Sequence, residues 1–257
     1  MRDPAGVVRR RFPSARGVTR LDAGWDYVVF DVDDEWIVRV PRRPEVEERL
    51  SRELRLLPEL APALPVAVPR LELVAGDPPA VAYPKIRGEP LRTPGARAAA
   101  ELERFLRALH SFPAASARAL GVVDDPRDAR AAEFRGRVLP LFGSDERGRA
   151  ARVLDEFETL EYEPSLVHGD LGSEHVLCAA DGSVTGVIDW SDARIGDPAL
   201  DYAWPLHGIG LPIQVDPGLR RHALVWHRLA PWHEVLYGLG RDSAFVERGL
   251  RGAAERL

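Results

Sequence analysis

Cysteine is nearly absent from this chain of 257 residues. Cys178 is the single one, so no internal disulfide can form. Without a Cys-x-x-Cys pair, a thiolate zinc site is excluded as well. A chain that makes no use of disulfides is typical of a reducing cytoplasm, which is where we expect this protein.

Lysine is equally scarce. Lys85 is the only lysine among 35 Lys and Arg residues, so any reaction step that needs a lysine has one candidate. The arginines are spread along the chain rather than gathered in a tract, and 40 acidic residues bring the formal charge to −5. Because phosphate binding usually leaves a basic footprint, we expect no nucleic acid partner.

Long apolar runs are missing too. No segment approaches the ~18 apolar residues that a membrane span needs, and the N-terminal sequence MRDPAGVVRRRF has no apolar stretch after its arginines. We therefore expect neither an export signal nor a membrane partner. With 45% hydrophobic and 29% charged residues, the chain can bury one sizeable core or two small lobes.

The first 86 residues predict a β-rich unit with one helix. Two β-branched and aromatic runs flank the polar turn Asp33-Asp34 within residues 26–40, which is the pattern of a hairpin. Leucines and a valine recur at helical spacing among charged residues at 45–60. Gly24 adds flexibility before the hairpin. Two more strands are predicted, with the turn sequence GDPP at 76–79 between them, at 71–75 and 80–86.

From Arg87 onward the pattern is mainly helical, and we place a domain boundary between residues 86 and 87. Amphipathic helices are predicted at 96–110, 145–161, 217–229 and 242–257. Three short apolar runs between them predict a small β insert, with strands at 165–167, 176–178 and 184–188. The predicted fold class is therefore α+β, with a β-rich N-terminal lobe and a mainly helical C-terminal lobe.

The segment from Leu166 to Trp204 contains the most informative polar residues. It places His168, Asp170, His175 and Asp189 at strand ends or in tight loops, where a rigid scaffold can bring polar groups together. Phosphoryl transfer needs a carboxylate for the attacking hydroxyl and further groups that hold a metal on the phosphates. In this chemistry the metal ligand follows the base Asp by five positions, and a second metal Asp follows the next hairpin. The spacing and order of Asp170, His175 and Asp189 agree with this pattern.

The N-terminal unit supplies a cation and its partner. Arg39 lies on the strand WIVRV, where a phosphate-holding cation would project, and Glu53 lies in the following helix. A cation that contacts phosphate oxygens needs an anion that fixes its rotamer, so the two residues form a meaningful pair.

Six stretches between about residue 21 and residue 204 carry a resemblance. They are GWDYVVF, WIVRVPRRPEVEERLSRELRLL, YPKIRGEPL, FLRALHSFP, VHGDLGSEHVL and GVIDWSDARIGDPALDYA. Together they resemble the aminoglycoside/macrolide phosphotransferase family of small-molecule antibiotic kinases, which has a bilobal protein-kinase-like fold. The resemblance implies a nucleotide-binding lobe at 1–86 and a catalytic and substrate-binding lobe at 87–257. The implied activity is Mg²⁺-dependent transfer of the γ-phosphate of ATP or GTP to a hydroxylated small molecule.

The resemblance also implies roles for individual residues. Asp170 would be the catalytic base, and His175 and Asp189 would be the Mg²⁺ ligands. Arg39 would contact phosphate with Glu53 as its partner. The hinge whose backbone meets the purine would be formed by the segment that contains Tyr83, Lys85 and Ile86.

Two positions depart from the pattern of most of the family. His175 stands where most members carry Asn, and an imidazole is a softer ligand than an amide oxygen for Mg²⁺. Arg39 stands where lysine is usual, and its planar fork remains compatible with phosphate contact. Both departures resemble the macrolide-kinase branch.

Other polar residues have simpler interpretations. We expect His168 to orient its loop, and His110 to be a packing histidine at a helix end. Asp197 and Asp201 should brace the catalytic loop and cap a helix that begins near Pro198.

The identity of the acceptor substrate stays open. Aromatic walls would suit a macrolide and carboxylates an aminoglycoside. The region after Asp189 offers both kinds of residue, namely Trp204, Trp226, Trp232, Asp192, Asp216, Glu234 and Asp242. An amino alcohol or a sugar is a further possibility, because the chemistry needs only a positioned hydroxyl.

Two other functions remain open. In a metal-dependent hydrolase, His168, Asp170, His175 and Asp189 would bind Zn²⁺ or paired metals and activate water. A metal-dependent hydrolase of this kind would have no role for the β-rich lobe. In a pseudokinase, the chain would bind a nucleotide and transfer nothing, which the retained Asp170 and Asp189 argue against.

Overall fold

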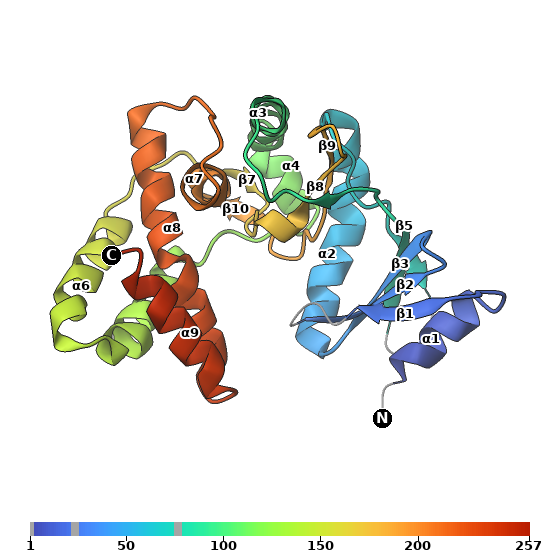
Figure 1. Cartoon of the computed structure of the whole chain (residues 1–257), viewed down its shortest axis with the longest axis horizontal. Coiled ribbons are helices and arrows are strands. Elements are labelled where there is room, and N and C mark those ends of the chain that lie inside the picture. Colours follow the sequence, from blue (N-terminus) through green and yellow to red (C-terminus); the bar gives the residue numbers. More distant parts are fainter. Residues whose placement is uncertain (1–2, 22–25, 75–78) are drawn as a thin grey trace.

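The computed structural model describes residues 3–21, 26–74 and 79–257. An antiparallel sheet lies at one end of the molecule and the helices of the C-terminal part lie at the other, with short strands in the middle (Figure 1). The predicted α+β class, with a β-rich N-terminal lobe and a mainly helical C-terminal lobe, is confirmed. The predicted flexible Gly24, and residues 76–78 of the predicted GDPP turn, lie outside the described residues.

The described residues up to Pro84 form a five-stranded sheet with two α-helices. The strand order is β1-β2-β3-β5-β4, and neighbouring strands are antiparallel. In chain order the elements are α1 (Pro4–Arg11), β1 (Val18–Leu21), β2 (Tyr27–Val32), β3 (Trp36–Pro41), α2 (Pro44–Leu60), the short helix η1 (Ala61–Ala63), β4 (Glu72–Val74) and β5 (Ala80–Pro84).

The predicted hairpin at 26–40 is confirmed as strands β2 and β3. Asp33 and Asp34 form its turn with φ of 56° and 58°, a region that Asp tolerates better than most residues. The Asp31 carboxylate accepts the backbone N–H of Asp34 at 2.9 Å, which closes the turn locally. Helix α1 and strand β1 were not predicted, because their apolar segments are too short to show a period.

Helix α2 links the sheet to the rest of the molecule. Val46 and Leu50 pack against the sheet, whereas Leu57 and Leu60, further along the helix, belong to the large core of the C-terminal part. One helix thus contributes apolar side chains to the cores of both lobes. The domain boundary at residue 86 stays a prediction.

The remaining elements are mostly helical, and they surround the large core. In chain order they are β6 (Glu89–Pro90), α3 (Ala96–His110), α4 (Ala114–Ala119), α5 (Arg127–Glu133), the short helices η2 (Phe134–Val138) and η3 (Leu139–Leu141), α6 (Ser144–Glu158), β7 (Ser165–Val167), the short helix η4 (Ser173–His175), β8 (Val176–Cys178), β9 (Val184–Val187), β10 (Arg194–Gly196), α7 (Ala199–Ala203), the short helix η5 (Trp204–Gly208), α8 (Pro217–Gly238) and α9 (Ser243–Ala254).

The three predicted strands of the C-terminal part exist, but they do not form one insert. Strand β7 pairs with β10, and the β8–β9 hairpin pairs with β6 in a separate sheet. The loop between β7 and β8 therefore runs from one sheet to the other, and it contains Asp170.

Helix α8 continues past the point where its sequence predicts an end. Pro231 has no N–H, so the carbonyl of His227, four residues earlier, loses its helical donor. The Arg256 guanidinium donates to that carbonyl at 2.9 Å. Arg256 follows the last residue of α9. Its hydrogen bond to the His227 carbonyl explains why α8 extends to Gly238 instead of ending near Leu229.

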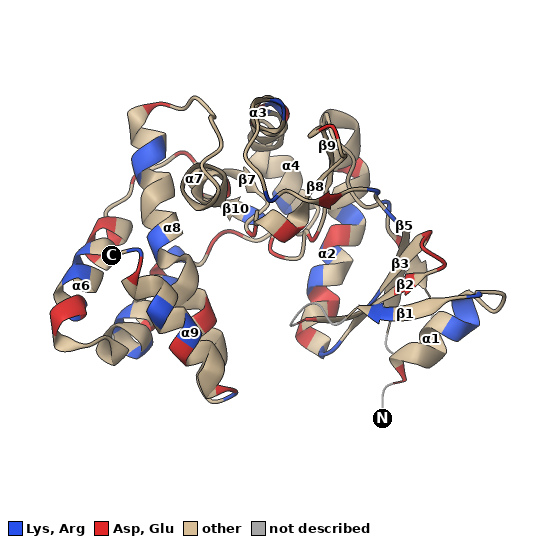
Figure 2. Ribbon diagram, viewed as in Figure 1, with Lys and Arg blue, Asp and Glu red and all other residues tan. Residues whose placement is uncertain are grey.

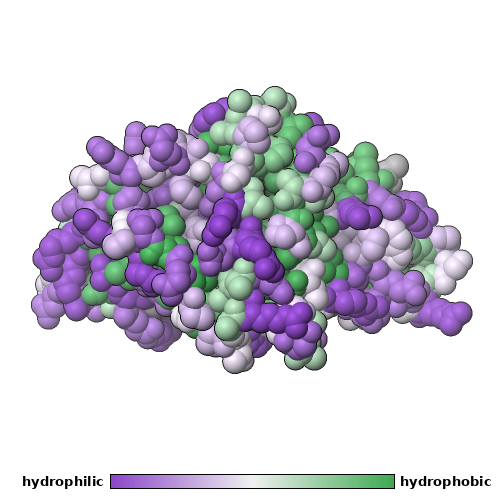
Figure 3. Space-filling view, turned by 90° about the horizontal axis from the view of Figure 1, so that it is seen from above, coloured by the Kyte–Doolittle hydropathy of each residue, from purple (hydrophilic) through white to green (hydrophobic). Residues whose placement is uncertain are grey.

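Charged residues of both signs are interspersed over the elements, as Figure 2 shows. Seen from above, hydrophilic residues cover much of the surface, with hydrophobic patches near its middle (Figure 3). Among the described helices, none combines the length and the apolarity that a membrane crossing requires.

A pair of leucine substitutions tests the assignment of the core. Leu102 of α3 is fully buried, whereas Leu73 of β4 is 64% exposed. Leu102→Ala should lower the free energy of unfolding by about 2–5 kcal/mol, because it removes buried contacts and leaves a cavity. Leu73→Ala should change it by less than about 0.5 kcal/mol. Urea unfolding of both variants measures the difference, and equal effects would contradict this core.

Candidate active site

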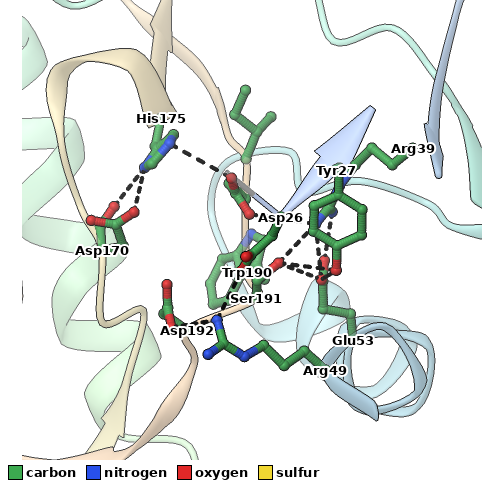
Figure 4. Close-up of polar contacts among 12 residues, drawn as sticks. Asp26, Tyr27, Arg39, Arg49, Glu53, Asp170, His175, Trp190, Ser191 and Asp192 are labelled. Atoms are coloured by element: carbon green, nitrogen blue, oxygen red, sulfur yellow. Dashed lines mark hydrogen bonds and ion pairs between the residues drawn. The ribbon is translucent and has the colours of Figure 1, made fainter. Parts of the chain in front are cut away.

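The three predicted residues of the catalytic segment meet at one place. The imidazole of His175 lies between two carboxylates, as the close-up in Figure 4 shows. Its Nδ1 is 3.6 Å from Asp170 Oδ2, and its Nε2 is 3.8 Å from Asp189 Oδ2. Asp170 follows β7, His175 ends η4, and Asp189 follows β9. Short strands of two different sheets thus bring these side chains together.

A buried carboxylate holds the loop that contains Asp170. Asp201 accepts the backbone N–H groups of His168 and Gly169, both at 2.9 Å, and it is fully buried. Its third partner is His110 Nε2 at 3.0 Å. The prediction that Asp201 braces this loop is confirmed. His110 is more than a packing residue, because it is hydrogen-bonded to that brace.

Asp197 also has the structural role that was predicted. One carboxylate oxygen accepts the N–H of Ala199 at the start of α7, and the other accepts Trp226 Nε1–H, both at 2.9 Å. The carboxylate thereby fixes the start of α7 against α8, which in turn places Asp201 under the loop.

His168 is a neutral, fully buried residue between the segment that contains Asp170 and the segment that contains Asp189. Its Nε2–H donates to the Ile188 carbonyl at 3.0 Å, while Nδ1 accepts the N–H of Asp170 at 3.3 Å. This assignment of the tautomer follows from the partners. Burial lowers the pKa of His168 to about 4, so the ring stays neutral near pH 7. These contacts agree with the predicted orienting role.

The hydrogen bond at Nδ1 determines which ring nitrogen of His175 keeps a free lone pair when the ring is neutral. Nδ1–H donates to the backbone carbonyl of Asp170 at 2.6 Å, so a neutral ring presents the lone pair of Nε2 toward Asp189. Burial lowers the pKa of His175, but the charges of Asp170 and Asp189 outweigh it and raise the pKa overall. The ring can therefore be an imidazolium between the two carboxylates or a neutral metal ligand.

The two carboxylates have opposite environments. Burial raises the pKa of Asp170 to about 6, with His175 opposing and the charge of Asp192 adding to the rise. The side chain nevertheless remains 59% accessible, so it is in reach of a molecule in solution. Asp189 has φ of 61°, and its pKa is below the usual range because Arg39 and His175 together outweigh its burial. Asp189 therefore stays ionised.

Arg39 and Glu53 form a bidentate pair, with N–O distances of 2.8 and 3.0 Å, and both are buried. The same guanidinium donates to Ser191 Oγ at 2.8 Å and to Asp189 Oδ1 at 3.4 Å. Its Cζ lies 4.0 Å from the ring centre of Tyr27. The predicted pair exists, and it connects β3 and α2 to the segment that contains Asp189.

Tyr27 and Ser191, two further partners of this pair, were not among the predicted site residues. Ser191 donates to Glu53 Oε1 at 2.9 Å, and the Tyr27 hydroxyl lies 3.3 Å from the same oxygen. Ser191 occurs two residues after Asp189, which was the only signal in the sequence. Tyr27 gave none, because it is an ordinary first residue of a strand.

A second set of ion pairs spans the two lobes. Arg49 of α2 lies 3.0 Å from Asp26 Oδ2 and 3.3 Å from Asp192 Oδ1, as Figure 4 shows. These charges are partly exposed, so each pair is worth at most about 1 kcal/mol. This contact has no local signal in the sequence, because residues 26, 49 and 192 are far apart in the chain.

The predicted hinge residues lie at and just after the end of β5. Tyr83 is buried and Ile86 is half-buried. Lys85 donates its ammonium to Asp31 and Asp34, each at 2.6 Å, and its backbone N–H to Glu35 at 2.8 Å. The only lysine is thus bound to the β2–β3 hairpin through its side chain. A role of this segment in purine binding stays a prediction.

Several residues suggested for the acceptor have other tasks. Trp226 and Trp232 are buried in the core, so they offer no wall to a ligand. Asp216 and Asp242 each accept a backbone N–H at 2.9 Å at the start of α8 and α9. Glu234 forms an ion pair with an arginine of α9. Two surface hollows of about 510 and 350 Å³ also lie away from Asp170.

The donor set fits a magnesium ion that is held largely by phosphates. Within the described ranges of the chain, no group of three or more His, Cys, Asp and Glu side chains could hold a metal. His175 Nε2 and Asp189 Oδ2, 3.8 Å apart, are two donors that can face one ion. Mg²⁺ is commonly bound by one or two protein groups plus substrate phosphates, whereas catalytic zinc needs about three protein ligands. The arrangement is therefore compatible with Mg²⁺ on a nucleotide.

Comparison with protein families finds one match that covers most of the chain. The model described as "Phosphotransferase enzyme family" matches residues 17–232. Among curated proteins, the chain is 31% identical over 206 residues to YcbJ of Bacillus subtilis (strain 168), which covers 70% of this chain and 67% of that protein. It is 44% identical over 73 residues to viomycin phosphotransferase of Streptomyces vinaceus, a match of 27% of this chain and 25% of that protein.

Solved structures share the fold. The GDP complex of aminoglycoside 2'-phosphotransferase-IIIa has a TM-score of 0.86 at 24% identity, covering 98% of this chain and 96% of that one. Macrolide 2'-phosphotransferase type I has a TM-score of 0.76 at 28% identity, covering 98% and 94%. The predicted kinase-like bilobal fold is thus confirmed.

The low pKa of His168 predicts acid sensitivity. An unfolded histidine takes up a proton near pH 6.5, but the folded one does so only near pH 4. The stability that depends on the neutral ring is therefore complete above about pH 7 and falls as the pH drops from 6.5 to 4, by at most about 3 kcal/mol. Urea unfolding across this range should show a smaller decline for His168→Gln, which cannot titrate. Parallel profiles for the two proteins would contradict the assignment.

Proposed function

This chain belongs to the phosphotransferase enzyme family, and from that membership we propose that it transfers the γ-phosphate of ATP or GTP to a hydroxyl of a small molecule, an antibiotic of the macrolide or aminoglycoside type. The observation that carries the proposal is the meeting of Asp170, His175 and Asp189 beside the Arg39–Glu53 pair. Phosphoryl transfer needs mainly positioning and charge stabilisation, which such a set of groups can supply.

Asp170 is the proposed catalytic base. Its carboxylate is accessible, and its pKa of about 6 leaves it mostly ionised at neutral pH while raising its affinity for a proton. It orients the acceptor hydroxyl and takes its proton as transfer proceeds. His168 and Asp201 hold the loop and do not contact the substrates.

His175 Nε2 and Asp189 are the proposed ligands of Mg²⁺. The ion, when bound with the nucleotide, neutralises charge on the phosphate oxygens. The bond from His175 Nδ1 to the Asp170 carbonyl fixes the ring so that Nε2 stays directed at Asp189, a common arrangement for histidine ligands. Asp189 is suited to the ion because it remains ionised.

Arg39 is the proposed phosphate contact. Its rotamer is fixed by two bonds to Glu53 and one to Ser191, and it reaches Asp189 at 3.4 Å. A guanidinium that is already held in place loses little side-chain entropy when a phosphate arrives. The hinge segment with Tyr83, Lys85 and Ile86 is the proposed site of the purine.

The proposed class of acceptor rests on the similarity to a solved structure and on the negative charge around Asp170. The likeness to macrolide 2'-phosphotransferase type I favours a macrolide. The carboxylates of Asp192, Asp189 and Glu174 all act on Asp170, and such a negative surrounding favours an acceptor with ammonium groups. The two kinds of antibiotic are therefore tested side by side.

Acceptor-dependent nucleotide consumption tests the proposal. The purified protein with Mg²⁺ and either ATP or GTP is assayed against macrolides, aminoglycosides and small hydroxylated metabolites. We expect turnover with a macrolide or an aminoglycoside, reduced at least about 10²-fold in Asp170→Ala, since the loss of a positioned base costs about 10²–10⁴-fold. Nucleotide affinity should change less than about threefold. A near-normal rate in Asp170→Ala would rule out its role as the base.

Asp189→Asn tests the metal role, because Asn tolerates the positive φ of this position and so keeps the backbone. Loss of the ionised ligand should weaken Mg²⁺-nucleotide binding by about tenfold or more, measured by calorimetry at several Mg²⁺ concentrations. Asp181→Asn, in the exposed β8–β9 turn, is the matched control and should leave affinity unchanged. Equal affinities of the two variants would refute the assignment of Asp189.

A further inference from the structure

Arg194 contacts the loop that contains Asp170. It is the first residue of β10, and it is paired with Val167 of β7, the residue that precedes His168. Only 11% of its side chain is exposed. Neither the sequence motifs nor the proposed mechanism gives this guanidinium a task.

The guanidinium contacts the backbone of both catalytic segments. Nη1 donates to the Asp192 carbonyl at 2.9 Å, and Nη2 donates to the Gly169 carbonyl at 3.4 Å. Gly169 immediately precedes Asp170, and Asp192 lies three residues after Asp189. One rigid planar group thus spans the segment of the proposed base and that of the proposed metal ligand.

Glycine at position 169 makes this contact possible. Its φ is 86°, and a Cβ there would lie 2.3 Å from the Asp192 carbonyl oxygen and 2.6 Å from Arg194 Nη1. The N–H of Gly169 is held by Asp201 at 2.9 Å. Both polar backbone groups of this residue therefore bind a buried charged side chain, an anion at the N–H and a cation at the carbonyl.

Asp125 compensates the charge of Arg194. Arg194 Nε lies 3.0 Å from Asp125 Oδ1, and the Asp125 side chain is 2% exposed. The backbone N–H of Asp125 donates to Ile195 of the same strand at 2.8 Å, which fixes the carboxylate beside Arg194. The same carboxylate oxygen also pairs with Arg130 at 2.6 Å.

Two arginines that share one buried carboxylate are a poor way to gain stability. Burial and the charge of Arg194 lower the pKa of Arg130, which reflects this crowding. Buried ion pairs often stabilise a fold less than apolar residues of similar volume would. The arrangement is therefore better explained by the backbone segments at Gly169 and Asp192 that Arg194 positions than by a gain in the stability of the fold.

We infer that Arg194, held by Asp125, is a positioning residue that fixes Asp170 relative to Asp189. The inference rests on the proposed function, in which Asp170 takes the proton of the acceptor. If the guanidinium is removed, the Gly169 carbonyl loses its donor and the carboxylate of Asp170 can shift. Displacement of a catalytic group by about 1 Å can cost about 10²-fold in rate.

Two substitutions test this role, with kcat and nucleotide affinity measured separately. Arg194→Ala should lower kcat by about 10²-fold, because Asp170 is misplaced, while nucleotide affinity changes less than about threefold. Arg194→Lys keeps the charge without the planar fork, so it should recover part of the rate, to within about tenfold of the original protein. Circular dichroism and thermal unfolding establish the folded fraction, and kcat is expressed per folded molecule. If Arg194→Ala does not fold, Arg194→Lys alone decides: a kcat lowered by more than twofold with nucleotide affinity changed less than about threefold supports the role, and a kcat within twofold overturns it.

Arg127 provides a matched control. It also donates to backbone carbonyls, those of Phe157, Glu158 and Leu160, but it does not contact the segments of Asp170 or Asp189. Arg127→Ala should lower the melting temperature and leave kcat per folded molecule within about twofold. A merely structural Arg194 would behave in the same way.

The outcomes separate this inference from the proposed function. Asp170→Ala is assayed in parallel with the same acceptor. If Asp170→Ala loses turnover but both Arg194 variants keep kcat within twofold, the inference is overturned and the proposed function stands. If both Arg194 variants lose rate and nucleotide affinity in equal proportion, the inference is overturned as well. If no acceptor is phosphorylated by the original protein, or if Asp170→Ala keeps its rate, the proposed function fails first and the inference fails with it.

Discussion

The buried carboxylate of Asp201 is the constraint on which the arrangement of the site depends. A carboxylate without solvent is costly unless its oxygens are hydrogen-bonded, and here two backbone N–H groups and His110 supply the bonds. Burial raises its pKa, but the hydrogen bond and charge of His110 outweigh this and lower the pKa overall, so the ion persists. Since the two N–H groups belong to His168 and Gly169, the anion determines where the loop turns and hence where Asp170 lies.

Beside the site, the two lobes meet through charged side chains, in addition to the apolar contacts that α2 makes in both lobes. Arg39 and Glu53 are buried and bind Ser191, which follows Asp189 by two residues. Arg49 makes a partly exposed contact to the same segment. A displacement of α2 would therefore move Arg39, the proposed phosphate contact, relative to the proposed metal ligands, which couples the position of the N-terminal lobe to the geometry of the site.

Much of this was predictable from the sequence, for identifiable reasons. The hairpin turn at Asp33-Asp34 and the helices α2, α3 and α6 have local signals, so they were placed to within three residues at each end. Tyr27 and Arg194 were missed because their importance comes only from three-dimensional contacts. The end of α8 was misplaced because Pro231 normally stops a helix, and the compensating donor is 29 residues away from the carbonyl that it binds. Trp226 and Trp232, two of the tryptophans suggested for the acceptor, proved to be core residues.

The central claim is that a nucleotide and its metal bind where His175 and Asp189 face each other, next to Asp170. The most direct test is a crystal structure of the protein with Mg²⁺ and a nucleoside triphosphate analogue that cannot be hydrolysed. We expect the ion about 2.0–2.1 Å from Asp189 Oδ2 and His175 Nε2, with the γ-phosphate toward Asp170. An ion bound by phosphates without Asp189, or a nucleotide bound away from the Arg39–Glu53 pair, would contradict it.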